Sequence, residues 1–122
     1  MAAWMLHDRF RTLDVRGRPI RSTSMDPQHL QSAYDERRRV LGDDYVDAQT
    51  HEPNSTLREF QDYITSTAWG VWARDGALST RDRSLLVLAM TAALGRMDEF
   101  KIHAASQART GVSDDELDEL LF

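Results

Sequence analysis

Apolar residues recur at helical spacing over most of the chain after residue 25. The pair Asp26-Pro27 is typical of a helix start, because Asp caps free backbone N–H groups and proline suits the first helical position. Gly42 is typical of a helix end. The pattern predicts a first helix over 27–41, whose apolar face contains Leu30, Ala33, Tyr34, Val40 and Leu41.

The next segment, DDYVDAQTHEPNS (43–55), is polar and contains a proline and an asparagine, so it predicts a connector. Thr56 and Glu59 then have the spacing of a capping box. They predict a second helix that runs to about Arg74, before a turn at Asp75-Gly76. Positions spaced by three and four predict its core face: Leu57, Phe60, Ile64, Ala68 and Val71.

A third helix is predicted between a cap at Ser79 or Thr80 and a stop at Gly95. Its segment 83–94, RSLLVLAMTAAL, is apolar nearly all round. A helix without a polar face is normally buried on several sides. We therefore expect this helix at the centre of the domain or of an oligomer.

Two further helices follow. Asp98 is the expected cap of a fourth helix that ends at Gly111, and Ser113 with Glu116 forms a capping box for a fifth. No segment shows convincing strand alternation. The predicted fold class is therefore all-α, a bundle of about five helices joined by short connections.

The length of 122 residues is typical of one domain, which we place at 25–122. Residues 1–24 differ, since they carry five arginines, two aspartates and no helical period, and they predict an extended or disordered arm or linker. A brief strand over 12–15 is an alternative there. The net charge of −5 comes from an acidic excess after residue 24, which argues against nucleic-acid binding.

The chain has no cysteine, which excludes disulfides, thiol nucleophiles and thiolate metal sites. No apolar run is long enough to span a bilayer, and the first residues lack the apolar core of a signal peptide. We therefore expect a cytoplasmic protein that is not bound to a membrane.

His103 is the first candidate for chemistry, because it shares a predicted helix with Phe100 and Ala104. A histidine on such a face can donate a proton, or a hydrogen bond to an oxyanion. The alternative is a core or surface histidine with an ordinary structural partner. The other histidines form no metal-ligand spacing, so no metal site is predicted: His7, His29 and His51.

Arg81 and Arg83 flank Asp82 at the start of the third predicted helix. The helix dipole favours anions there, so two arginines gain nothing from it. One interpretation is that they bind a carboxylate. The other is that they form ion pairs with Asp82, Asp98 or Glu99.

Trp69 and Trp72 lie near the end of the second predicted helix, with Gly70 between them permitting close approach of another backbone. The two aromatic residues can wall a pocket, or belong to the core or to an interface between subunits. The acidic run 114–119 fits a helix N-terminus, and its spacing does not indicate a catalytic role for Glu116.

Several blocks in this order resemble the 4-carboxymuconolactone decarboxylases: V-L-G-D at 40–43, F-x-x-x-I-T-x-x-A-W-G at 60–70, T-R-x-R-S-L at 80–85, A-M-x-A-A-L-G-R at 89–96, the histidine at 103 and G-V-S-x-x-E at 111–116. Each block alone is unspecific, but the series is specific and covers roughly 25–122. The resemblance implies an all-α bundle shared with alkylhydroperoxidase-D-like proteins. It also implies homo-oligomers, commonly trimers or hexamers.

The family reaction is loss of CO2 from 4-carboxymuconolactone to give 3-oxoadipate enol-lactone, in protocatechuate breakdown by the β-ketoadipate pathway, without a cofactor. The resemblance makes His103 and Arg83 the candidate catalytic residues. Arg81, Trp69 and Trp72 are candidates for substrate binding. The peroxidase relatives need a C-x-x-C pair, which this chain lacks.

In the family, the helix that begins at the last block continues into a further segment, whose final helix packs on the third helix and contributes to the active site. The resemblance thus predicts that the sequence ends before that segment. Two other readings stay open: a non-catalytic helical oligomer built on the family scaffold, and a relative that acts on another lactone or β-keto acid.

Overall fold

The computed structural model describes residues 26–51 and 54–122. The predicted arm over 1–24 and its alternative strand lie outside these residues. All regular structure in the described ranges is helical, which confirms the all-α class. The proposed boundary between arm and domain stays a prediction.

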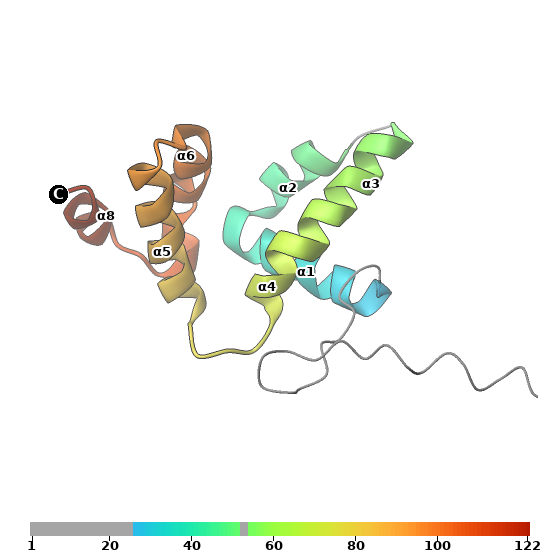
Figure 1. The fold of residues 1–122 in the computed structure, drawn as a ribbon, viewed down its shortest axis with the longest axis horizontal. Coiled ribbons are helices and arrows are strands. Elements are labelled where there is room, and N and C mark those ends of the chain that lie inside the picture. The colour runs from blue at the N-terminus through green and yellow to red at the C-terminus, as the bar shows by residue number, and fades with distance from the viewer. Residues whose placement is uncertain (1–25, 52–53) are drawn as a thin grey trace, which may run out of the picture.

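The helices form two groups that lie side by side (Figure 1). The first group holds α1 (Pro27–Leu41), α2 (Asp43–Thr50), α3 (Ser55–Ile64), a π-helical turn η1 (Thr65–Trp69) and α4 (Gly70–Ala73). The second holds α5 (Thr80–Ala93), α6 (Met97–Ala105), α7 (Gln107–Thr110) and α8 (Asp114–Leu120). The segment between α4 and α5 joins them.

Helix α1 begins and ends as predicted. The Asp26 side chain accepts a hydrogen bond from the Gln28 backbone N–H at 3.1 Å, and Gly42 ends the helix at a positive φ of 91°. The predicted connector after it is wrong, because 43–50 form α2. Val46 of this short helix is fully buried, and Arg38 of α1 forms ion pairs with Asp43 and Asp47. Tertiary contacts of this kind stabilise a helix that its composition does not favour.

Helix α3 differs from its prediction at both its start and its core face. Its cap is the Asn54 side chain, which accepts from the backbone of Thr56 and Leu57, rather than a Thr56–Glu59 box. Most of the predicted core face is exposed, including Leu57 and Phe60. The buried residues instead follow in η1 and the start of α4: Thr65, Ser66, Trp69 and Gly70.

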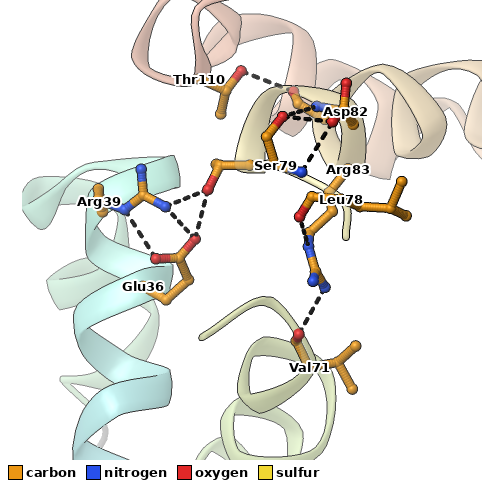
Figure 2. A network of polar contacts seen from close by, with 10 residues as sticks. Glu36, Arg39, Val71, Leu78, Ser79, Asp82, Arg83 and Thr110 are labelled. Carbon is orange, nitrogen blue, oxygen red and sulfur yellow. Dashed lines mark hydrogen bonds and ion pairs between the residues drawn. The ribbon is translucent and has the colours of Figure 1, made fainter. Parts of the chain in front are cut away.

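The predicted start of α5 is confirmed, with Ser79 as its cap. The Ser79 side chain and Asp82 form a reciprocal capping box (Figure 2). The expectation that α5 is buried on several sides is wrong for the single chain. Leu88 is fully buried, but Leu86, Met90 and Leu94 are 47%, 53% and 75% exposed. An apolar stripe therefore faces outward, on the side opposite Leu88.

The fourth predicted helix is divided in two. Helix α6 starts after Arg96 rather than at a cap on Asp98, and it breaks at Ser106 before α7. The predicted stop is correct, because Gly111 adopts the left-handed conformation with φ 83°. The predicted Ser113–Glu116 capping box is also confirmed, and it opens α8.

Each group has its own small apolar core. In the first, Ala33 and Val40 of α1 pack with Trp69. In the second, Leu88, Phe100 and Val112 pack together, with Leu117 and Leu120 of α8 against them. Leu117 and Leu120 thus cover the second core in part.

Polar contacts tie the groups together. Arg39 of α1 donates to Glu36 and to the Thr80 hydroxyl at the start of α5, and Thr80 donates to Glu36 at 3.4 Å (Figure 2). Farther along, the Arg109 guanidinium of α7 lies over Gly42, where an added Cβ would be 3.0 Å from its Nη2. These contacts join α1 and the residue after it to α5 and α7 of the second group.

Candidate active site

Three of the predicted site residues meet at the junction of the two groups. The rings of Trp69 and Trp72 have centroids 5.3 Å apart at a tilt of 45°. The His103 ring, from α6, stacks on both, with centroid distances of 6.0 Å and interplanar angles of 21° and 24°. The cluster of Trp69, Trp72 and His103, called here the aromatic cluster, joins residues that are more than 30 positions apart.

His103 is half-buried, and burial lowers the pKa of its imidazole below the ordinary value. Desolvation disfavours the charged form, so the ring is neutral near pH 7. Its Nδ1 is buried without a hydrogen-bond partner among the described residues. A buried polar atom without a partner costs free energy, so the fold leaves hydrogen-bonding capacity unused at this position.

The tryptophans owe their position to η1 and to Gly70. Helices with one extra residue per turn are rare and are frequent at functional sites. A Cβ on Gly70 would lie 2.3 Å from His29 Nε2, so a side chain there would clash with that ring. The close approach predicted at Gly70 is therefore made by a side chain, not by a backbone. His29 Nε2 also lies 3.0 Å from the Ser66 carbonyl oxygen, within hydrogen-bond distance.

Arg83 is bound to backbone carbonyls. Its Nη1 donates to the Val71 carbonyl at 2.7 Å and its Nε to the Leu78 carbonyl at 3.2 Å (Figure 2). A Cβ on Gly76 would be 3.1 Å from its Nη2. Arg83 thus joins the start of α5 to the end of α4 and to the segment that links the two groups, and Val71 directly precedes Trp72 in the sequence. The predicted ion pairs with Asp82, Asp98 or Glu99 are not formed by Arg83 within the described residues.

Arg81 points to α8. It forms an ion pair with Glu116, and its Nε donates to the Gly111 carbonyl at 3.3 Å. Glu116 is not one of the three partners expected from the sequence. Arg81 is therefore not brought to the aromatic cluster by any of these contacts.

Arg37 was missed by the sequence reasoning, although a signal was present. It lies four residues after Ala33 and three before Val40, on the apolar face of α1. Its side chain is only 6% exposed, and its Nη1 donates to Gln61 at 3.0 Å and to Thr65 at 2.9 Å. An arginine at an apolar-face position is the sequence signal of a buried polar contact.

No group of three or more acidic or histidine side chains in the described ranges is arranged to hold a metal ion. Across the same ranges, no helix has the length and apolarity that crossing a bilayer requires.

An all-α fold with an aromatic and histidine site between helices is consistent with the family resemblance, and the comparisons agree. The sequence model of the carboxymuconolactone decarboxylase family matches residues 58–122. This chain belongs to that family. It is 38% identical over 98 residues to a 4-carboxymuconolactone decarboxylase of Acinetobacter baylyi. The aligned residues are 80% of this chain and 72% of the relative.

A second relative is a nitrosuccinic acid decarboxylase of Metarhizium robertsii. It is 34% identical over 87 residues, or 70% of this chain and 60% of the relative. The chain therefore spans less than two thirds of that relative's length. No solved structure matches the chain significantly.

Proposed function

We propose that this protein is a cofactor-independent decarboxylase that converts 4-carboxymuconolactone to 3-oxoadipate enol-lactone and CO2, a step in protocatechuate degradation. The observation that carries the proposal is the aromatic cluster, in which a neutral histidine with an unsatisfied nitrogen lies against two tryptophans. The family match and the identity to a 4-carboxymuconolactone decarboxylase support this substrate.

The reaction needs a stabilised oxyanion. The C–C bond to the departing carboxylate breaks, its electron pair forms a new ring double bond, and the original double-bond pair moves toward the lactone carbonyl. The carbonyl oxygen then carries the developing negative charge, and the ring carbon beside it takes a proton. Hydrogen-bond donors already directed at that oxygen lower the barrier.

His103 is the proposed donor to this oxygen. Because burial lowers its pKa, the imidazole is neutral, and a neutral ring donates a hydrogen bond more readily than it transfers its proton. Trp69 and Trp72 supply apolar walls that strengthen such a hydrogen bond by excluding water. The tryptophans are thus proposed to bind the substrate ring.

The substrate has two carboxylates, for which an arginine is the natural ligand. Arg83 is the better candidate. Its guanidinium donates to two backbone carbonyls and forms no ion pair with a carboxylate among the described residues, so its charge is available to the substrate. Arg81 would have to exchange Glu116 for the substrate. We therefore assign the reacting end to His103 and Arg83, and a secondary binding role to Arg81.

The protein is also proposed to form a homo-oligomer, a trimer or hexamer as in the family, and to act in the cytoplasm. The exposed apolar stripe of α5 supports association, because large exposed apolar patches are uncommon on monomers.

Decarboxylation of another small carboxylic acid is the second candidate, favoured by the relative that is named a nitrosuccinic acid decarboxylase. A third, a non-catalytic oligomer on the same scaffold, predicts no turnover at all. One assay with 4-carboxymuconolactone and nitrosuccinate separates the three.

The test follows absorbance of freshly generated 4-carboxymuconolactone with the purified chain, and mass in parallel. We expect turnover that falls by about 10²–10⁴-fold in His103→Ala, the usual range for loss of a catalytic proton-transfer or donor group. His51→Ala, at the residue that caps the C-terminus of α2, is the matched control and should keep the full rate. A folded wild-type protein that turns over neither substrate would contradict the enzyme proposal. An unchanged rate in His103→Ala would remove the role of this residue.

A further inference from the structure

Among the residues that the structure describes, Arg37 is the most deeply buried charged side chain that the proposed mechanism does not use. It is 6% exposed, and burial lowers the pKa of its guanidinium. Its hydrogen bonds go to two neutral side chains, Gln61 and Thr65, and its Nε has no partner among the described residues. Burying a cation without a carboxylate is costly, and the two hydrogen bonds offset part of that cost.

The two acceptors lie on either side of the change from α-helix to π-helix. Gln61 belongs to α3, and Thr65 is the first residue of η1. The Gly70 N–H donates to the Thr65 carbonyl, five residues back, which closes the wide turn. A single guanidinium therefore contacts both sides of the place where the α-helix changes to a π-helical turn, which holds one more residue than an α-helical turn.

The extra residue decides where Trp69 points. Each residue of an α-helix rotates the side-chain direction by about 100°, so adding or removing one turns every later side chain away from its neighbours. Trp69 is the last residue of η1, and its ring packs with Ala33 and Val40 of α1 while it stacks on His103. Trp72 follows one turn later.

We propose that Arg37 is a positioning residue: through its bond to Thr65 it holds η1 in the π-helical form and so fixes Trp69 against His103 and Trp72. The planar guanidinium reaches both acceptors from one nitrogen, while its aliphatic stem fills the apolar face of α1. The part of this inference that concerns catalysis rests on the proposed function. The part that concerns Trp69 does not.

The test is circular dichroism of the two tryptophans, whose rings are close enough to couple. The chain has three tryptophans, so a Trp4→Phe background removes the one outside the described residues. The signal that arises from coupling between the two indole rings is called here the couplet. Trp72→Phe in that background should abolish it and so identifies it. Thr65→Val, close in size to threonine, removes the acceptor while Arg37 keeps its charge, and Arg37→Met removes the donor.

We expect Thr65→Val and Arg37→Met to change the couplet in the same way while helix content stays constant, and the double variant to add nothing further, as for two ends of one interaction. Arg38→Met is the matched control, because Arg38 pairs with α2 instead, and it should keep the couplet. An unchanged couplet in Thr65→Val would overturn the proposal, and so would an equal change in Arg38→Met. If Arg37→Met does not fold, Thr65→Val decides alone.

Turnover provides the second readout. Displacing a wall of the site should lower kcat by about ten- to a hundredfold in Thr65→Val, the range expected when a group that positions the reaction shifts. Loss of the couplet with full turnover would overturn the link from Trp69 to catalysis. If the wild-type chain turns over no substrate, the proposed function fails, and the couplet still tests the role of Arg37.

Discussion

Helix α3 contacts α1 through side-chain hydrogen bonds, whereas Leu88 of α5 lies in an apolar core. On α3 and η1, polar groups face α1: Tyr34 donates to Asp62 at 2.7 Å, and Arg37 donates to Gln61 and Thr65. On α5, Leu88 faces α6 and the Val112 side chain in an apolar core. Yet both helices leave apolar residues exposed, Phe60 on α3 and Met90 on α5 among them.

The difference shows that the apolar face of a helix is not necessarily the face that packs against the rest of the same chain. Hydrogen bonds are directional and so restrict geometry more than apolar contacts, which are non-directional. The polar contacts thus suit the segment that leads into Trp69, whose own ring packs on Ala33 and Val40 of α1. The apolar attachment supplies stability to the group that carries His103.

The largest expected effect is on the apolar side. Leu88→Ala should lower the free energy of unfolding by about 2–5 kcal/mol, because it leaves a cavity at a fully buried position. Leu86→Ala, on the exposed side of the same helix, should change it by no more than about 0.5 kcal/mol in the monomer. Chemical denaturation measures both. Equal losses would mean that another surface covers Leu86 in solution. If the Leu86→Ala protein also has a lower molecular mass in solution than the wild type, that surface belongs to a second copy of the chain.

Leu88 and Leu86 also show what the sequence pattern does not predict, namely which side of an apolar helix is buried. Periodicity found α1, and the cap pattern of Ser113 and Glu116 found the start of α8, because these signals depend on neighbouring residues alone. It gave α3 the wrong face, since the buried contact there is polar and η1 shifts the period by one residue. It missed α2, whose stability comes from the tertiary contacts of Val46.

The candidate site was predictable in part for the same reason. Trp69, Trp72 and His103 were found by residue type and family resemblance, and the structure brings them together. The partners of Arg81 and Arg83 were not predictable. Glu116 is 35 residues from Arg81, and a backbone carbonyl such as that of Val71 has no signature in the sequence.

The polar attachment should give a smaller effect than Leu88. Tyr34→Phe removes the donor to Asp62 and keeps the ring, so a partly buried carboxylate loses a partner. The expected loss is roughly 1–3 kcal/mol of unfolding free energy, the range for leaving a buried polar group without its partner. Tyr63→Phe is the control, because Tyr63 is exposed on α3, the helix that carries Asp62. If Tyr34→Phe behaves like Tyr63→Phe, α3 is not held to α1 by this bond.

The smallest effect is expected where the two groups meet, and there its sign is informative. His103→Leu keeps much of the volume and removes the buried Nδ1 that has no partner. Replacing such an atom by carbon is nearly neutral or stabilising, so at pH 8 the variant should be at least as stable as the wild type while it loses turnover. A residue kept at the expense of stability is typical of an active site.

The pH dependence sharpens this prediction. Because burial lowers the pKa of His103 in the folded protein, the unfolded chain binds a proton first as the pH falls below about 6.5, the ordinary histidine value. Wild-type stability should therefore decrease with falling pH between that value and the lower folded pKa, with a slope of at most about 1.4 kcal/mol per pH unit from this group. His103→Leu should lose this part of the slope, whereas His51→Ala should keep it. Equal slopes in wild type and His103→Leu would mean that His103 is not desolvated by the tryptophans, and that the two helical groups do not exclude water where they meet.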